Sequence, residues 1–126
     1  LRERATTLKE MAEQAAFLYA EFEDYEEKAA AKQLKAGARE PLTELRTRLA
    51  EIEPWEPATL QGVIQSVVDD LEVGFGKVGQ PLRVALTGRG AAPGNDQVLA
   101  LLGRERSLAR IDRAISFIDQ RIAAAR

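Results

Sequence analysis

The chain has 126 residues, of which 45% are hydrophobic and 30% charged, a composition typical of one ordinary globular domain or two small subdomains. It contains no cysteine and no histidine, which excludes disulfides, thiolate and imidazole metal sites, and histidine-based catalysis. No apolar run reaches the roughly 18 residues that a membrane span requires, and no signal-peptide pattern is present. We therefore expect a cytoplasmic protein without a membrane partner.

The net charge of −2 is unevenly distributed along the chain. Residues 1–82 hold 10 Lys/Arg and 16 Asp/Glu, whereas residues 83–126 hold 8 arginines, no lysine and 4 Asp/Glu. The cations of the C-terminal third are thus all arginine, whose planar, multi-donor guanidinium suits phosphate and RNA contacts. Ordinary solvated helix faces would give the same pattern, so charge alone leaves both interpretations open.

The N-terminal sequence predicts two helices separated by an acidic turn. The first begins at Thr6 or Thr7, because Thr7 and Glu10 have the spacing of a capping box, and apolar residues follow at helical spacing. The acidic run at 21–27 fits a solvated turn better than a packed face. A short second helix over 29–34 should stop near Gly37.

Two further helices follow, on either side of a break. Pro41 suits the first turn of the third helix, whose apolar stripe is Leu42, Leu45, Leu49 and Ile52. The segment 54–57, with two prolines around Trp55, predicts a subdomain boundary. The fourth helix ends before Gly74, and its apolar residues are Leu60, Val63, Ile64, Val67, Val68 and Leu71.

The C-terminal part predicts three more helices. Alternating apolar residues in 81–87 are also compatible with a strand, but an isolated strand has no partner in this chain, so we expect a short helix with Pro81 at its start. Residues 89–94 form a loop, and a helix from about Asp96 ends at Gly103. The last helix carries Leu108, Ile111, Ile115, Ile118 and Ile122. The fold class is therefore all-α, a helical cage or multi-helix bundle of two small subdomains, 1–54 and 55–126.

The sequence offers no active site. Asp69 and Asp70 are adjacent, so they diverge by about 100° on a helix and do not form an acid–base pair. The glycines between residues 74 and 94 match neither a phosphate loop nor a dinucleotide motif. We expect no catalytic residue, no metal and no cofactor in this chain.

Two features admit both a structural and a functional role. Trp55 could stack on a base, but a tryptophan at such a junction more often packs an interface. Arg106, Arg110 and Arg113 lie at i, i+4 and i+7 and share one helix face, with Arg104 just before them. These arginines could contact backbone phosphates or form a solvated face.

Arg83 stands apart because it lies between Leu82 and Val84 in a segment too apolar for a loose surface loop. An unpaired buried charge is costly, so its guanidinium must be paired or must face a ligand. A salt bridge to one of the N-terminal acids is the structural alternative.

Three short stretches resemble one family when taken together. They are residues 80–88 (QPLRVALTG), 101–105 (LLGRE) and 110–114 (RIDRA), and residues 7–12 (TLKEMA) and the Trp55 junction add to the match. In this order they resemble the C-terminal anticodon-binding region of bacterial glutamyl-tRNA synthetases, from about residue 1 to residue 122. That region is an all-α cage of two subdomains which binds the anticodon loop of tRNA(Glu).

The resemblance assigns roles to individual positions. Arg83 matches an arginine that contacts the anticodon bases, and Arg4 matches one that faces the first anticodon base in discriminating enzymes. Ala92, Pro93 and Asn95 match the remaining contact stretch. Family members often have Thr at the position of Ala92 and an apolar residue at that of Asn95, which leaves the backbone as the expected contact there. Arg104, Arg106 and Arg110 complete the expected RNA-binding set.

The resemblance also implies what the whole protein does. No ATP-binding or Rossmann-like motif is present, so we expect a fragment of a longer class I enzyme that attaches glutamate to tRNA with ATP and Mg²⁺. The expected partner is the tRNA(Glu) anticodon stem-loop, with no DNA and no membrane, and the chain is expected to be monomeric. Two alternatives remain open, a helical protein-interaction module without an RNA role and a free-standing regulator derived from the synthetase.

Overall fold

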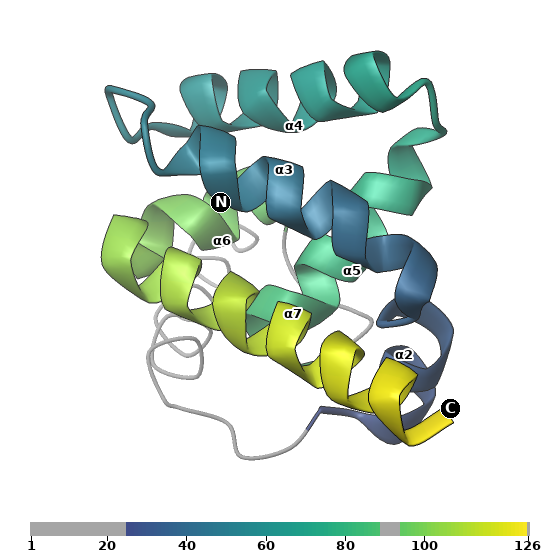
Figure 1. Ribbon diagram of the computed structural model, residues 1–126. Helices are drawn as coiled ribbons and strands as arrows, with labels where there is room; N and C mark the ends of the chain where they lie inside the picture. The colour runs from purple at the N-terminus through teal and green to yellow at the C-terminus, as the bar shows by residue number, and fades with distance from the viewer. Residues whose placement is uncertain (1–24, 89–93, 126) are drawn as a thin grey trace, which may run out of the picture.

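The computed structural model describes residues 25–88 and 94–125, and this part of the chain is helical without strands (Figure 1). The helices in chain order are α2 (Glu27–Gln33), the 3₁₀ turn η1 (Ala36–Ala38), α3 (Arg39–Leu49), α4 (Pro57–Leu71), α5 (Phe75–Thr87), α6 (Asn95–Leu102) and α7 (Arg104–Ala125). The all-α prediction is confirmed. The first helix and its capping box at Thr7 lie outside the described residues.

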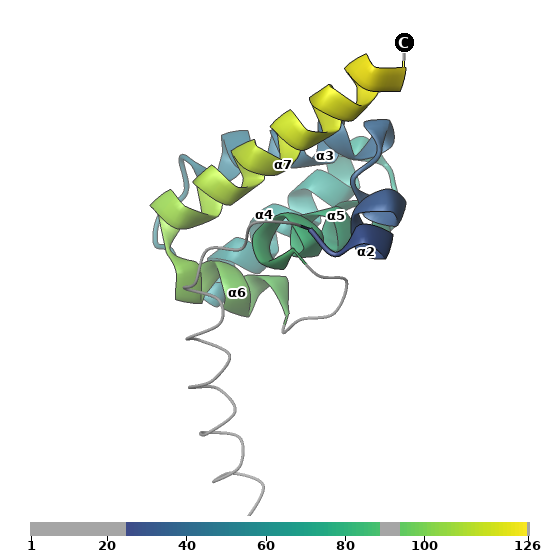
Figure 2. The same cartoon turned by 90° about the horizontal axis from the view of Figure 1, so that it is seen from below.

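Helix α5 lies at the centre of the arrangement. It contacts α2, η1, α3, α4, α6 and α7, that is, every other helix of the described chain. The two ribbon views agree that α3 and α7 form one layer, with α5 behind it (Figures 1 and 2). The side chains of α5 are correspondingly buried, including Val78, Leu82, Val84, Ala85 and Leu86. Burial of each large apolar side chain contributes about 1.5–3 kcal/mol, so packing decides the conformation of this segment.

The predicted start of this helix at Pro81 is wrong. Helix α5 begins at Phe75, and Pro81 lies inside it. A proline inside a helix removes one backbone donor, which is why propensity places it at the start. Here Pro81 is itself buried, and Val78 and Leu82 on either side pack into the core, so tertiary contacts offset the lost hydrogen bond.

A close approach at Gly79 joins α5 to its neighbours. A Cβ atom there would lie 2.9 Å from Cε1 of Phe75, so the phenyl ring packs directly on the glycine backbone. Asn95 at the start of α6 donates from Nδ2 to the Gly79 carbonyl oxygen at 2.9 Å. The absence of a side chain at residue 79 thus lets Phe75 and α6 come close to this turn of α5.

The predicted apolar stripes of α3 and α4 are confirmed. Leu42, Leu45 and Leu49 are fully buried, while Ile52 lies beyond the end of α3 and is half-buried. In α4 the buried residues are Leu60, Val63, Ile64, Val67 and Val68. The helix ends at Leu71, before Gly74, and the left-handed residue that terminates it is Glu72, with φ of 54°.

The boundary predicted after residue 54 falls in the connection between α3 and α4, where the Glu53–Pro54 peptide is cis. The hydrophobic core continues across this point, because α3 packs against α4, α5 and α7. The division into subdomains 1–54 and 55–126 stays a prediction, since residues 1–24 of the first unit lie outside the described range.

The remaining helices differ from the predictions only at their ends. Helix α2 ends at Gln33, earlier than expected, and Gly37 lies inside η1. Helix α6 ends at Leu102 before Gly103, which has φ of 83°. In α7, Ile111 and Ile118 are buried and Leu108, Ile115 and Ile122 are half-buried. Within the described residues no helix combines the length and apolarity needed to cross a membrane.

Replacing Leu82 by alanine tests the central position of α5. Leu82 is fully buried, so Leu82→Ala should lower the free energy of unfolding by about 2–5 kcal/mol through lost burial and the cavity left behind. Lys77→Ala, at an exposed position of the same helix, should change it by less than about 0.5 kcal/mol. Urea denaturation followed by circular dichroism measures both. Equal effects of the two substitutions would contradict the central role of α5.

Candidate nucleic-acid interface

Arg83 lies near the C-terminal end of α5 and is only partly exposed. Its Nε is buried and has no hydrogen-bond partner. Within residues 25–88 and 94–125, no carboxylate pairs with its guanidinium, so the structural alternative of a salt bridge finds no support there. A partly buried cation without a protein acceptor has donors to offer to a ligand.

The backbone that carries Arg83 is fixed by several hydrogen bonds. The Thr87 hydroxyl donates to the Arg83 carbonyl oxygen at 2.8 Å, and the Gly88 amide donates to the Val84 carbonyl at 2.7 Å. Gly88 has φ of 76°, a conformation that glycine adopts without steric cost, and it ends the helix. Its carbonyl accepts from the Glu26 amide at 2.7 Å, which joins the start of α2 to this end of α5.

Arg110 contacts the same end of α5 from the inside. It is only 4% exposed, and its Nη1 donates to the Leu86 carbonyl oxygen at 2.6 Å. A cation beside the C-terminal carbonyls of a helix is stabilised by the helix dipole. The sequence suggested Arg110 for RNA contact, but in the structure its guanidinium is directed into the protein and holds the turn that follows Arg83.

The face shared by three arginines of α7 is present as the spacing predicted. Arg106, Arg110 and Arg113 line one cavity of about 420 Å³ together with Glu105 and Ala109. Arg106 and Arg113 are partly exposed, unlike the buried Arg110. The lining residues that the structure describes all belong to α7, and three of the five are arginines.

Arg104 and Trp55 form a structural contact away from this cavity. The guanidinium of Arg104 lies 5.4 Å from the centroid of the Trp55 ring, and its Nη2 donates to the Ile52 carbonyl oxygen. Trp55 donates from Nε1 to the Leu99 carbonyl oxygen at 2.8 Å. These contacts join α6 and the start of α7 to the connection after α3, as expected for a tryptophan that packs an interface.

The expected contact stretch 92–95 is described only at its end. Asn95 is 6% exposed and directs its side-chain amide at Gly79, while its Oδ1 is buried without a hydrogen-bond partner. Its side chain therefore positions α6 on α5. Arg4, Ala92 and Pro93 lie outside the described residues. Of the expected set, Arg83 lies near the end of α5, Arg110 contacts the last turn of that helix, Arg106 lines a cavity with Arg110, and Arg104 lies at the Trp55 junction.

The acidic residues considered for catalysis have structural contacts. Asp70 forms an ion pair with Arg48 at 2.7 Å, and Asp69 accepts a hydrogen bond from Gln65 at 3.0 Å. Among the described residues, no group of three or more acidic side chains could hold a metal ion.

The sequence interpretation missed a second concavity. It lies between α2 and α7 and includes Tyr25, Phe117 and Arg121. Arg113, Phe117 and Arg121 are spaced i, i+4 and i+8, so they share a helix face. That spacing could have indicated the α7 side of the concavity, but the segment at Tyr25 that faces α7 could be identified only from the fold.

The sequence pattern of the family described as "anticodon binding domain" matches residues 1–115. The chain belongs to this anticodon-binding domain family. The matched range ends at Ile115, about halfway along α7, and it includes Arg83 and the arginines that line the 420 Å³ cavity.

Two solved structures are similar to this chain. One is a glutamate tRNA ligase from Elizabethkingia meningosepticum in complex with its amino acid, with 25% identity, a TM-score of 0.81, and coverage of 94% of this chain and 23% of that chain. The other is a glutamate-tRNA synthetase from Elizabethkingia anophelis, with 26% identity, a TM-score of 0.68, and coverage of 80% and 19%. The chain thus spans less than a quarter of the proteins that it resembles.

The buried contact of Arg110 predicts a loss of stability. Arg110→Met keeps the length of the side chain but leaves the Leu86 carbonyl without this donor, so we expect a loss of about 1.5–3 kcal/mol in the free energy of unfolding. Urea denaturation measures the loss, with Lys32→Met at an exposed position of α2 as the control. If both variants unfold at the same urea concentration as the parent chain, the account of Arg110 is wrong.

Proposed function

We propose that this chain is the anticodon-binding part of a glutamate–tRNA ligase and that it recognises the anticodon loop of tRNA(Glu). The proposal rests mainly on Arg83. This arginine is partly exposed and has no protein acceptor among the described residues, and it lies near the end of α5, which contacts every other described helix. Membership in the anticodon-binding domain family and the likeness to two glutamate–tRNA ligases support it.

Arg83 is the residue that we assign to base recognition. Proteins read RNA sequence mainly in loops, where unstacked bases expose their edges to hydrogen-bond donors. The planar guanidinium can donate two parallel hydrogen bonds to the acceptors of a base. Because the hydrogen bonds of Thr87 and Gly88 hold the surrounding turn, little conformational freedom is lost on binding.

The other expected residues have more indirect roles. We assign Arg106, which is partly exposed at the basic cavity, to contact with backbone phosphates. Arg104 and Arg110 contribute through the contacts that position α7 against the Trp55 junction and α5. The proposal keeps Arg4, Ala92, Pro93 and the backbone of Asn95 as loop contacts, on the resemblance alone.

The chemistry of the whole ligase would belong to another part of the protein. By this proposal the enzyme attaches glutamate to tRNA with ATP and Mg²⁺, and the present chain supplies binding energy and discrimination between anticodons. The partner of this chain is then the anticodon stem-loop of tRNA(Glu).

Replacing Arg83 by alanine tests the proposal. If Arg83 reads a base, Arg83→Ala should weaken binding of a tRNA(Glu) anticodon stem-loop by about 1–3 kcal/mol, or about 5- to 150-fold in Kd. The loss should be much smaller for a stem-loop whose anticodon is altered. Fluorescence anisotropy with labelled stem-loops measures the Kd, and Lys77→Ala on the same helix is the control for a lost positive charge.

Two outcomes contradict the assignment. An equal loss for all RNAs would make Arg83 a nonspecific charge contact. If the parent chain shows no preference for tRNA(Glu) over unrelated RNA, the alternative of a helical protein-interaction module is favoured instead.

A further inference from the structure

Phe75, the first residue of α5, is an apolar side chain left at the surface. Among the residues that the structure describes, it is the one large hydrophobic side chain that is exposed, at 45%. Single exposed apolar residues are common in soluble proteins, so exposure alone does not indicate a function. The contacts of the ring and its position relative to Arg83 are therefore decisive.

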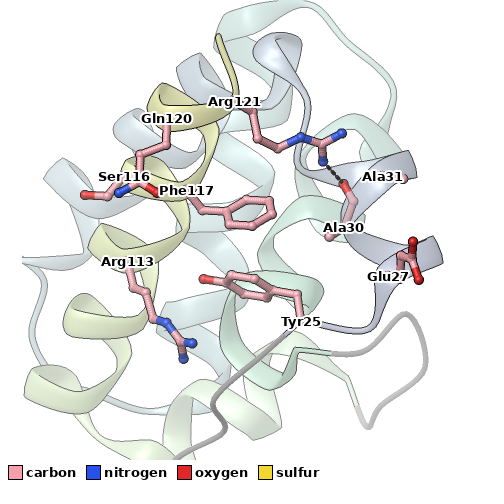
Figure 3. Close-up of a pocket in the computed structure, with 9 residues that line it drawn as sticks. All are labelled: Tyr25, Glu27, Ala30, Ala31, Arg113, Ser116, Phe117, Gln120 and Arg121. Carbon is pink, nitrogen blue, oxygen red and sulfur yellow. Dashed lines mark hydrogen bonds between the residues drawn. The ribbon is translucent and has the colours of Figure 1, made fainter. Parts of the chain in front are cut away.

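The other aromatic side chains in the described part of the chain have structural contacts. Trp55 donates a hydrogen bond to the Leu99 carbonyl oxygen. Tyr25 and Phe117 contact each other edge to face, with ring centroids 4.8 Å apart (Figure 3). All three are partly buried against the hydrophobic core, and Phe75 differs from them because it remains exposed.

The Phe75 ring is held by contact with Gly79, one helical turn later. A Cβ atom at residue 79 would lie 2.9 Å from Cε1 and 3.3 Å from Cδ1 of Phe75, so the ring occupies the space that a side chain at residue 79 would need. A phenylalanine side chain has only two rotatable bonds, and this contact restricts its rotation. A restricted aromatic ring loses little entropy when a ligand packs against it.

The start of α6 contacts the same turn of α5. Asn95 donates from Nδ2 to the Gly79 carbonyl oxygen at 2.9 Å, so Phe75 and the Asn95 amide meet at Gly79. Asn95 is also the last residue of the stretch 92–95, which the family resemblance assigns to RNA contact. The exposed ring thus lies beside one end of that stretch.

Phe75 and Arg83 share one side of α5. Phe75, Gly79 and Arg83 are spaced i, i+4 and i+8, which places them in a row along the helix. With a rise of 1.5 Å per residue, Phe75 and Arg83 are about 12 Å apart along the helix axis. One stacked nucleic-acid strand advances about 3.4 Å per nucleotide, so this separation corresponds to roughly three or four nucleotides. A single RNA loop can therefore reach both residues.

This side of α5 carries no negative charge of its own, because no Asp or Glu lies between Phe75 and Thr87. The carboxylates nearest in sequence belong to Glu72, before the helix, and to Asp96 in the first turn of α6. Asp96 is directed at its own helix start, where its Oδ1 would lie 2.9 Å from a Cβ atom at Gly94. Stacking on a ring depends on the π-face rather than on charge, so these acids do not oppose it.

An unstacked nucleobase fits these surroundings better than a protein partner. The core of a protein interface requires a patch of several apolar side chains, whereas Phe75 is the one exposed large hydrophobic residue among those described. A single ring is sufficient for a base, because base and ring stack face to face.

From these observations we propose that one unpaired base of the RNA loop stacks on Phe75 while another base is read by Arg83. This inference rests on the proposed function, because the loop is the one that the anticodon interface binds. Every base has a π-face, so Phe75 would contribute affinity with little dependence on sequence, whereas Arg83 contributes discrimination.

The test is a double-mutant cycle between Phe75 and the bases of the RNA loop, with the whole 126-residue chain. Phe75→Leu keeps an apolar side chain beside Gly79 but removes the ring. The Kd for a tRNA(Glu) anticodon stem-loop, measured by fluorescence anisotropy, should rise about 5- to 150-fold, the range that corresponds to one lost base–aromatic stack. A series of stem-loops that each carry one abasic site in the loop is then measured. For the RNA that lacks the stacking base, Phe75→Leu and the parent chain should have equal Kd values.

Three controls separate stacking from effects on the fold. Phe75→Tyr keeps the ring, so its Kd should stay within about twofold of the parent value. Thermal unfolding followed by circular dichroism confirms that each variant is folded at the assay temperature. The ratio of Kd values for cognate and altered anticodons should be the same in Phe75→Leu as in the parent chain, since a displaced α5 would change this ratio through Arg83.

Two results overturn the inference. One is an unchanged Kd for folded Phe75→Leu, which would make Phe75 an ordinary exposed residue. The other is an equal loss for every abasic stem-loop, because the ring would then act through the fold rather than on a base. The proposed function fails separately, when the parent chain does not discriminate between anticodons. Disappearance of the Phe75 effect at one abasic site would in that case still support stacking.

Discussion

The structure depends on the burial of a helix that carries a cation near its end. Helix α5 packs against every other described helix, and most of its residues from Val78 to Thr87 are buried. The same packing determines where Arg83 lies, because the turn after it is held by Thr87, Gly88 and Arg110. A guanidinium on a rigid support loses little freedom when it binds a ligand, so the proposed recognition by Arg83 would use the same helix that stabilises the core.

The arginines of this chain have different functions although they look alike in sequence. Arg104 and Arg110 donate to backbone carbonyls and hold helix ends together. Arg39 and Arg46 pair with Asp119 and Asp112 of α7, and such exposed pairs each contribute little to stability. Arg113 and Arg121 are supported by rings beside a groove, and Arg83 has a buried Nε without an acceptor. The surroundings of each arginine, rather than its residue type, therefore determine what it contacts.

Much of this could be predicted from the sequence, because apolar spacing determines which faces are buried. The leucines of α3 and the isoleucines of α7 lie where their spacing placed them. The start of α5 was mispredicted because the burial of Pro81 depends on helices distant in sequence. The inward direction of Arg110 and Asn95 could not be predicted either, since the Leu86 and Gly79 carbonyls become their partners only in the folded chain.

The most direct test follows the Arg83 side chain itself by nuclear magnetic resonance. Its Nε–H resonance, assigned by comparison with an Arg83→Lys variant, is observed while the tRNA(Glu) anticodon stem-loop is added to the labelled chain. The account predicts that this resonance shifts, that its exchange with water slows, and that both changes saturate together with RNA binding. If the RNA binds to saturation while the Arg83 resonance keeps its position and exchange rate, the central claim is contradicted.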